Sequence, residues 1–412
     1  MKNHILLIAD GRSPITKRWI EILKRLNFRI SLVSTYPFSL DVEVENIFIL
    51  PVAFSAAAEQ KTVSDQRGNS KPSQNWKKKI IQNARPLAMN VRYWLGPYTL
   101  RKHQKRLLEI IAQIKPDLVH ALRVPYEGML ARVVPDHIPL VVSIWGNDFT
   151  LHANANKKMG QLTRQVMERA NGVLADVHRD IALAHQWGLS NYRPTMVVPG
   201  AGGIHLDEIL LSKTKDIRDL HIPDDALLII NPRGVRAYAR TDTFFQSIPG
   251  VIEEYPKSIF ICPDMKGKPE AEKWIERLNI QQHVRLLPAL DQHTLWALFH
   301  QSPVSLSITT HDGTPNTLLE AMACGCFPIA GDIDSLREWI TPGVNGFLVE
   351  PDNPHKLSEA IIAALDNLPL RQKAAEFNLK IINSKAEVGQ VQDRLSKYYK
   401  IFLKSKSHSE SL

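Results

Sequence analysis

Residues 309–325 read Thr-Thr-His-Asp-Gly-Thr-Pro-Asn-Thr-Leu-Leu-Glu-Ala-Met-Ala-Cys-Gly. The apolar run directly before them predicts a buried strand, and the apolar spacing after Pro315 predicts a helix over 316–324. Thr314 or Asn316 can cap this helix, and proline suits its first turn. The stretch is therefore a strand, a short loop and a helix, which is the repeating unit of a parallel α/β sheet.

The start of this predicted helix has the properties of a diphosphate-binding site. The free N–H groups of Asn316, Thr317 and Leu318 point back toward the loop, and a helix N-terminus carries about half a positive charge. Glu320, one turn further on, can accept hydrogen bonds from the vicinal hydroxyls of a ribose, as an acidic residue does in dinucleotide-binding folds. Asp312 precedes the turn, on the side where a sugar would sit. The alternative is an ordinary strand-turn-helix unit in which Glu320 forms a salt bridge.

Short strands and helices alternate along the whole chain, which predicts an α/β fold with two doubly wound, Rossmann-like domains. The segment Pro199–Gly203 breaks the pattern and predicts a linker. We expect an N-terminal domain at 1–203 and a C-terminal domain at 204–385. A final helix within 386–412 would pack back on the N-terminal domain and end in a disordered tail. The two domains would face a central cleft, because ligands bind at the carboxyl ends of the strands in such sheets.

The composition excludes several classes of protein. The chain has 412 residues, of which 44% are hydrophobic and 23% are charged, so we expect neither a disordered nor a fibrous protein. No apolar run approaches the ~18 residues that span a membrane, and the start does not resemble a secretory leader. Its three cysteines fit neither a disulfide framework nor a zinc site. We expect a cytoplasmic enzyme without a metal site, and we interpret Asp332-Ile333-Asp334 as a loop and a helix cap.

The net charge of +9 comes from one segment. Residues 67–108 contain 11 Lys and Arg and no acidic residue, whereas the remaining 40 Lys and Arg are balanced by 42 Asp and Glu. Trp, Tyr and Leu are mixed with the basic residues, as in segments that contact an anionic membrane surface, where each Lys or Arg contributes ~1 kcal/mol. The alternative is a solvated basic helix beside a polar loop. We expect no nucleic acid partner, because the chain has no nucleic-acid-binding motif.

The stretch Asp312–Gly325 resembles the signature of the retaining glycosyltransferases of family 4 (the glycosyl transferases group 1), which have the GT-B fold. That signature has two acidic residues eight positions apart around a Gly-containing turn, followed by Leu-Glu-Ala-Met-Ala-x-Gly. Lys115–His120 in the first half, and residues 328–332, 338–340 and 343–349 in the second, are similar to the same family. The resemblance implies a GT-B fold and transfer of a sugar from a nucleotide-diphosphate sugar, which would bind to the C-terminal domain.

The resemblance also implies a role for each matching position. Glu320 would bind the ribose of the nucleotide, and Asp312 would hold hydroxyl groups of the donor sugar. Arg233, at the end of the first strand of the second domain, would neutralise the leaving diphosphate, since a guanidinium pairs with two phosphate oxygens. The backbone amides that would bind the diphosphate belong to Gly313, Thr314, Asn316, Thr317 and Leu318.

The chain departs from the family pattern in the second domain. Asp312 stands where Glu is usual, so its reach is one methylene shorter. Tyr238 stands where a Lys normally follows the arginine by about five positions. We expect Arg240 to supply this missing cation.

It also departs from the pattern in the first domain. The family frequently has a His after the strand that ends here at Ile144, and in its place this chain has Trp145-Gly146-Asn147-Asp148. The N-terminal Gly-rich loop is reduced to Asp10–Pro14. The candidate residues on the acceptor side are therefore Gly11, Arg12, Trp145, Asn147 and Asp148.

Together these observations predict an enzyme that transfers a sugar with retention of its anomeric configuration. Arginines and the helix N-terminus would stabilise the leaving charge, so no metal or other cofactor is expected. The basic segment suggests a lipid-linked or surface glycan as acceptor, which would place the enzyme on the inner face of a membrane. Two alternatives are a non-hydrolysing nucleotide-sugar epimerase and an inactive GT-B protein that binds a nucleotide sugar.

Overall fold

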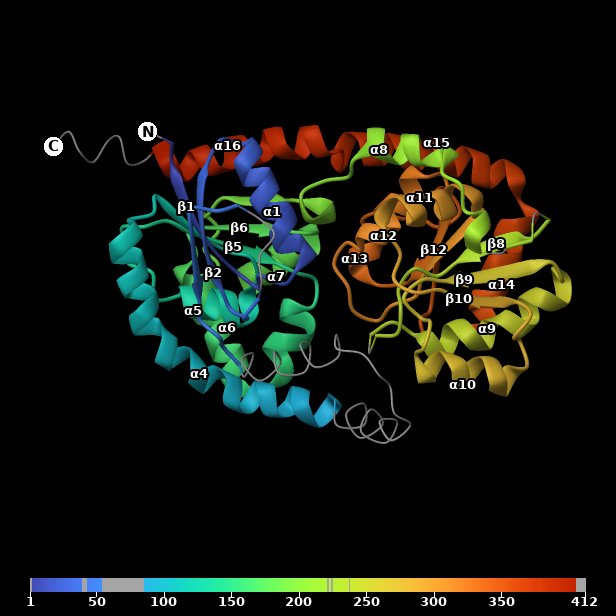
Figure 1. The fold of residues 1–412 in the computed structure, drawn as a ribbon, viewed down its shortest axis with the longest axis horizontal. Helices are drawn as coiled ribbons and strands as arrows, with labels where there is room; N and C mark the ends of the chain where they lie inside the picture. Colours follow the sequence, from blue (N-terminus) through green and yellow to red (C-terminus); the bar gives the residue numbers. More distant parts are fainter. Residues whose placement is uncertain are drawn as a thin grey trace. The chain divides into compact units, whose positions relative to one another are not determined.

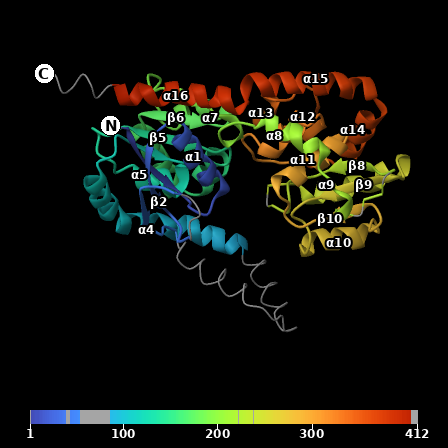
Figure 2. The same cartoon turned by 45° about the horizontal axis from the view of Figure 1, so that its top comes forward.

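The computed structural model describes residues 2–38, 43–53, 85–220, 222–223, 225–236 and 238–404. These residues form two compact units, which Figures 1 and 2 show from two sides. Unit 1 contains the described residues up to Asp176, residues 180–197, and the chain from Gln392 onward. Unit 2 contains residues 177–179 and 198–391.

The boundary between the units differs from the expected linker. Residues 199–203 belong to unit 2, because the backbone there packs closely against it. A Cβ on Gly200 would lie 3.1 Å from Ile204, and one on Gly203 would lie 2.6 Å from the Cα of Val388. Both glycines have a positive φ, at +63° and +112°, which side chains rarely adopt. The glycine-rich stretch is thus a tightly packed turn within unit 2.

Unit 1 is built around a parallel sheet with the strand order β3-β2-β1-β4-β5-β6-β7. The central strands are buried apolar runs, as is usual for a parallel sheet that is covered on both faces. The strands are β1 (His4–Ala9), β2 (Arg29–Ser34), β3 (Asn46–Ile49), β4 (Leu118–Ala121), β5 (Leu140–Ile144), β6 (Gly172–Ala175) and β7 (Thr195–Val197). The helices are α1 (Pro14–Arg25), α4 (Arg85–Ile114), α5 (Met129–Ala131), α6 (Lys157–Arg169), α7 (His178–Gln186), which begins in the short piece assigned to unit 2, and α16 (Val388–Lys404).

Helix α4 continues through Pro97, although proline normally interrupts a helix. Pro97 has no N–H to donate to the carbonyl of Tyr93, and the side-chain amide of Asn156 donates to this carbonyl instead, at 3.1 Å. The hydroxyl of Thr99 donates to the carbonyl of Gly96 at 2.6 Å. The side chain of another helix therefore compensates for the missing hydrogen bond. No helix in the described ranges is long and apolar enough to cross a membrane.

Unit 2 has a parallel sheet with the order β10-β9-β8-β11-β12-β13. Along β8, Leu228 and Ile230 pack into one hydrophobic cluster and Ile229 into another, so both faces of the sheet are covered. The strands are β8 (Leu227–Ile230), β9 (Ser258–Cys262), β10 (Val284–Leu286), β11 (Val304–Ser307), β12 (Phe327–Gly331) and β13 (Phe347–Val349). The helices are α8 (Leu206–Leu211), α9 (Thr241–Glu254), α10 (Pro269–Leu278), α11 (Gln292–Gln301), α12 (Asn316–Ala323), α13 (Asp334–Arg337), α14 (Pro354–Asp366) and α15 (Leu368–Lys385).

The last described helix, α16, packs on unit 1 (Figure 1). The hydroxyl of Tyr399 is 2.9 Å from Nδ1 of His120, a residue of β4 with no exposed surface. The hydroxyl of Tyr398 donates to the carbonyl of Val173 at 3.1 Å. A Cβ on Gly172 would come within 2.4 Å of the Phe402 ring, so glycine is required for this close approach. The end of the chain therefore completes the core around the first sheet.

Candidate functional site

The start of α12 in unit 2 has two N–H groups available for a ligand. The N–H of Leu318 donates to the carbonyl of Pro315 at 3.0 Å, so the expectation that Leu318 binds a diphosphate is not met. Within the described part of the chain, the N–H groups of Asn316 and Thr317 have no hydrogen-bond partner. These two groups lie at the positive end of the helix dipole and can bind an anion.

Gly313 and Thr314, the other two residues of the expected amide set, precede the helix, and the amide of Gly313 is engaged. The N–H of Gly313 donates to Oδ1 of Asp312 at 3.0 Å. The hydroxyl of Thr314 accepts a hydrogen bond from Nε1 of Trp339 at 3.0 Å, and this side chain is buried. Gly313 and Thr314 therefore shape the turn before α12.

Arg233 reaches the start of α12 from the neighbouring strand. It follows β8, which pairs in parallel with β11, and α12 follows β11, so both lie at the carboxyl edge of the sheet. Its buried guanidinium forms an ion pair with Asp312, and Nη1 lies 3.5 Å from Oγ1 of Thr317. Its buried Nε has no hydrogen-bond partner among the described residues. The structure thus brings together Arg233, Asp312 and Thr317.

Arg240 does not join this group. Its guanidinium is held by the carboxylate of Asp242, with contacts of 2.9 and 2.7 Å, and it also pairs with Asp352. Two carboxylates thus pair with Arg240, and its role toward the diphosphate stays a prediction. Asp242, in the first turn of α9, holds the Arg240 guanidinium at the start of that helix.

Arg236 is a further cation near Asp312, and the sequence analysis did not identify it. Its Nη1 donates to the hydroxyl of Tyr238 at 3.1 Å. Burial lowers the pKa of Arg236, but Tyr238 and the carboxylates of Asp312 and Asp264 outweigh it, so the pKa is raised. Arg236 thus lies within electrostatic reach of Asp312. Arg236 stands three positions after Arg233, whereas the family pattern has its second cation about five positions after the arginine. The family spacing therefore does not point to Arg236.

Glu320 is held inside unit 2. Only 5% of Glu320 is exposed, and its Oε1 accepts a hydrogen bond at 2.9 Å from the side chain of Gln292 at the start of α11. Asp312, on the other side of the turn, is anchored through its carbonyl, which accepts a hydrogen bond from Ser335 at 2.8 Å. The two carboxylates thus have fixed positions on either side of the start of α12.

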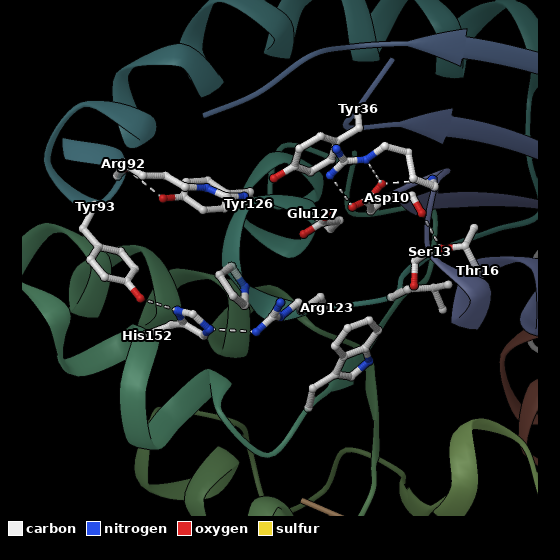
Figure 3. A pocket seen from close by; sticks show the side chains of 14 residues that line it. Asp10, Ser13, Thr16, Tyr36, Arg92, Tyr93, Arg123, Tyr126, Glu127 and His152 are labelled. Carbon is white, nitrogen blue, oxygen red and sulfur yellow. Dashed lines mark hydrogen bonds and ion pairs between the residues drawn. The ribbon is translucent and has the colours of Figure 1, made fainter. Parts of the chain in front are cut away.

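A second candidate site is a cavity of about 290 Å³ in unit 1 (Figure 3). Strands β1, β2, β4 and β5 each end at this cavity, which is the edge of a parallel sheet where ligands bind. The inner face of α4 completes the wall. The lining residues are Asp10, Arg12, Ser13, Thr16, Tyr36, Arg92, Tyr93, Leu122, Arg123, Pro125, Tyr126, Glu127, Trp145 and His152.

Of the five acceptor-side candidates, Arg12 and Trp145 line this cavity. Gly11 does not, because its N–H donates to Ser34 and its Cα packs against the Phe38 ring. Asn147 also lies outside the lining, and its side-chain oxygen is buried without a partner.

Asp148 lies behind the cavity and positions one of its walls. It has no exposed surface, and its carboxylate accepts hydrogen bonds from Nε of Arg123 at 2.8 Å and from the N–H groups of Val124 and Trp145 at 3.1 Å. The cavity also contains polar residues that the sequence analysis did not identify, chiefly Arg92, Arg123, Tyr126, Glu127 and His152.

His152 is neutral in this cavity. Burial and the charges of Arg123 and Arg92 lower its pKa to about 3. Its Nε2 lies 2.8 Å from Nη2 of Arg123, which can only donate, so Nε2 accepts. The proton is therefore on Nδ1, which lies 2.7 Å from the hydroxyl of Tyr93. This chain of hydrogen bonds fixes the position of Arg123.

Glu127 brings a carboxyl group to the same cavity. Burial raises its pKa to about 7, although the hydroxyl of Thr35, which donates to Oε1 at 2.7 Å, acts in the opposite direction. The carboxyl group is therefore protonated in part near neutral pH and can either donate or accept a hydrogen bond. Within the described ranges, no group of three or more His, Cys, Asp or Glu side chains is arranged to hold a metal ion.

Two family models match the chain. The model described as "Glycosyl transferases group 1" matches residues 212–380, and the model described as "Glycosyl transferase 4-like" matches residues 71–177. The first match contains both Arg233 and the start of α12. The second contains α4 and most of the residues around the cavity of unit 1.

Curated relatives and solved structures agree with these matches. The chain is 22% identical over 204 residues to D-inositol 3-phosphate glycosyltransferase of Thermobifida fusca, which covers 47% of this chain and 46% of that protein. It is 22% identical over 287 residues to N-acetyl-alpha-D-glucosaminyl L-malate synthase of Bacillus anthracis. This match covers 68% of this chain and 73% of that protein. The chain spans less than half the length of the first curated relatives it matches.

The fold of the chain is similar to that of HepE from Anabaena, solved in complex with UDP. The TM-score is 0.72 at 15% identity, with 97% of this chain and 100% of that chain covered. Two glycosyl transferase family models thus match most of the chain between them, and the chain has the two-domain α/β GT-B fold.

Proposed function

We propose that the chain transfers a sugar from a nucleoside diphosphate sugar to an acceptor with retention of configuration. The observation that carries this proposal is the meeting of the Arg233 guanidinium with the free amides of Asn316 and Thr317. As the bond between sugar and diphosphate breaks, negative charge grows on the leaving oxygen. Positive groups that are already in place lower the barrier, because they need not reorganise during the reaction.

The ion pair between Arg233 and Asp312 suits this reaction. A bound diphosphate competes with Asp312 for the guanidinium, since phosphate oxygens also pair with its planar fork. Asp312 then becomes available to accept hydrogen bonds from hydroxyls of the donor sugar. Glu320, held by Gln292, binds the ribose in the same manner. Arg236 adds a second positive charge, and these groups together serve where other transferases use a divalent metal.

The family models and the curated relatives support transfer of a sugar. The group 1 model matches most of unit 2, and the names of the relatives describe transfer of a sugar or synthesis of a glycoside. HepE, with the same fold, was solved with UDP, which is the leaving group of such a reaction. Both acidic residues and Arg233 are also retained, which supports an active enzyme over an inactive binding protein.

A thermal-shift screen of nucleoside diphosphates and their sugars, followed by a transfer assay, tests the proposal. At 100 times its dissociation constant, a bound nucleotide is expected to stabilise the protein by ~2.7 kcal/mol. Nucleotide stabilisation together with formation of a glycoside would support it. Release of an epimerised sugar without an acceptor would favour the epimerase, and binding without transfer or donor hydrolysis would favour the inactive protein. The absence of any nucleotide effect would contradict the assignment of the site in unit 2.

We also propose that α4 contacts an anionic membrane surface. Val91, Trp94, Leu95 and Tyr98 are exposed and follow one another at helical spacing, which puts them on one face of α4. The same face continues with exposed Arg101, Lys102 and Lys105. An apolar stripe followed by basic residues is typical of a helix that lies at a membrane interface. The N-terminal part of the basic segment, residues 67–84, lies outside the described residues.

Replacement of Trp94 and Tyr98 by alanine is expected to reduce binding to phosphatidylglycerol vesicles by at least about tenfold. Removal of two large side chains from the apolar interface costs about 1.5–3 kcal/mol each when both are fully inserted. Cosedimentation with vesicles measures this effect. Tyr192→Ala is the matched control, since Tyr192 is 97% exposed in unit 1 but lies on another element. Equal binding by the double variant and the control would disprove the contact.

A further inference from the structure

We propose that the acceptor carries an anionic group, a phosphate or a carboxylate, which binds in the unit 1 cavity between Arg92 and Arg123. This inference rests on the proposed transferase function and names the chemistry of its acceptor. It follows from the charges, the hydrogen bonds and the backbone conformation around the cavity (Figure 3).

The three arginines of the cavity differ in how their charges are balanced. Arg12 is bound at Nε and Nη2 by the two oxygens of Asp10, at 3.1 and 3.0 Å. Arg123 is paired through Nε with Asp148. Arg92, in contrast, has no carboxylate within ion-pair distance among the residues that the structure describes. A partly buried guanidinium without a counter-ion is costly, so it favours a ligand that supplies the negative charge.

Arg92 also has an unused hydrogen-bond donor. Its Nε is buried and has no partner in the described structure. Its guanidinium lies over the Tyr126 ring, 4.7 Å from the ring centre, which leaves the edge of the guanidinium plane for oxygen atoms. Burial raises the pKa of Tyr93 and lowers that of His152, while the charges of Arg123 and Arg92 act to lower both, so the two guanidiniums act on the same part of the cavity.

The turn that packs against Arg92 has a strained backbone at Tyr126. Tyr126 has a φ of +68° and a ψ of −52°, a conformation that a bulky side chain rarely adopts and that costs about 1–3 kcal/mol. Its hydroxyl donates to the carbonyl of Arg92 at 2.8 Å. A Cβ on Gly96 would lie 2.8 Å from the Tyr126 ring, so α4 and the turn fit closely only because glycine is present. Such strain is typical of binding sites, and here it places the ring under Arg92.

The acidic residues in the cavity and directly behind it do not cancel this charge. Asp10 and Asp148 are each engaged by one arginine, which leaves Arg92 in excess. Glu127 has a pKa of about 7, so it can bind an anion in its protonated form by donating a hydrogen bond. In its ionised form it can accept a hydrogen bond from a hydroxyl of the same acceptor.

Isothermal titration calorimetry with glycerol 3-phosphate tests the inference, with neutral glycerol as the comparison. Wild-type protein is expected to bind the phosphate and not glycerol. Arg92→Gln is expected to weaken this binding by about 10- to 100-fold, as is usual for loss of a hydrogen bond to a charged group. Arg106→Gln is the matched control, because it removes one charge from an exposed position of the same helix, where Arg106 pairs with Glu109.

Further variants separate this inference from the proposed function. Arg233→Ala is expected to keep glycerol 3-phosphate binding, and Arg92→Gln is expected to keep nucleoside diphosphate binding. If only Arg233→Ala loses the phosphate, the anion binds in unit 2 and the inference is overturned while the donor site stands. No binding by wild type, or equal binding by Arg92→Gln, also overturns it. Arg92→Lys keeps the charge, and partial recovery of binding distinguishes a ligand contact from a structural role.

A transfer assay identifies the source of the anionic group. One arm offers glycerol 3-phosphate in solution, and the other offers phosphatidylglycerol in vesicles. Transfer that depends on Arg92 in either arm supports the inference and names the source. Transfer to neutral glycerol alone, with no dependence on Arg92, contradicts it.

Discussion

Replacement of Arg233 by alanine is expected to lower the turnover number of sugar transfer by about 10²–10³-fold, the usual effect of removing one preorganised group that stabilises charge in a transition state. Arg233 stands beside the free N–H groups of α12 and is the most deeply placed cation of the unit 2 site. The loss should fall on kcat, because the charge on the diphosphate increases as the bond breaks. Steady-state kinetics with saturating donor measures it.

Arg240→Ala is the matched control for this variant. It removes an arginine of the same unit whose guanidinium is occupied by Asp242 and Asp352, so transfer should remain near the wild-type rate. Arg236→Gln should give an intermediate loss, because Arg236 acts on the same site through its charge alone. Wild-type turnover by Arg233→Ala, or a larger loss in Arg240→Ala, would show that the cations have been assigned incorrectly.

Replacement of Glu320 by alanine is expected to weaken donor binding by about 10- to 100-fold, because hydrogen bonds to a charged group contribute about 1.5–3 kcal/mol. The ribose does not change during transfer, so Glu320 should stabilise the bound donor and the transition state equally. The variant should therefore raise KM for the donor and change kcat little. This pattern is the opposite of that expected for Arg233→Ala.

Glu320→Gln and Glu276→Gln complete the test. Glu320→Gln keeps the shape of the side chain and should recover part of the affinity. Glu276 is exposed on α10, and its replacement should leave KM unchanged. Thermal unfolding of Glu320→Ala is required as well, since the change also removes the hydrogen bond with Gln292. A wild-type KM in a folded Glu320→Ala protein would exclude Glu320 as the ribose-binding residue.

The sequence predicts the part of the site that lies in one continuous segment. The strand, the turn and the helix around Pro315 follow from local signals, namely an apolar run, a proline and a helical spacing. The family resemblance assigns Arg233 correctly to a position beside this turn, because it follows a strand of the same sheet. Leu318 is different, because its N–H donates to the carbonyl of Pro315, three positions earlier. The sequence does not show whether the first turn of a helix forms such a bond.

Arg240 and Arg236 show why side-chain partners are harder to predict. Both are arginines shortly after β8, and only contacts made in the folded chain distinguish them. Asp352, one partner of Arg240, lies more than a hundred positions away. The carboxylate of Asp312, which acts on Arg236, is also distant in sequence. Spacing alone therefore does not distinguish the two arginines.

The cavity of unit 1 could be predicted only in part. Arg12 and Trp145 are predicted because they stand where the family pattern has a Gly-rich loop and a His, but Arg92 lies on a helix whose pattern is interrupted by Gly96-Pro97. The side chain of Asn156 that compensates for Pro97 is 63 positions away from its partner Tyr93. A site assembled from four strand ends and one helix face has no compact signature in the sequence.

The position of α16 constrains how the newly made chain can mature. The strands of the first sheet are synthesised before most of unit 2, whereas the tyrosines that cover His120 and contact Val173 follow it. The nascent unit 1 must therefore remain incomplete, with part of its interior open to water, until α16 has been translated. A premature stop anywhere before residue 398 thus leaves the core of unit 1 incomplete.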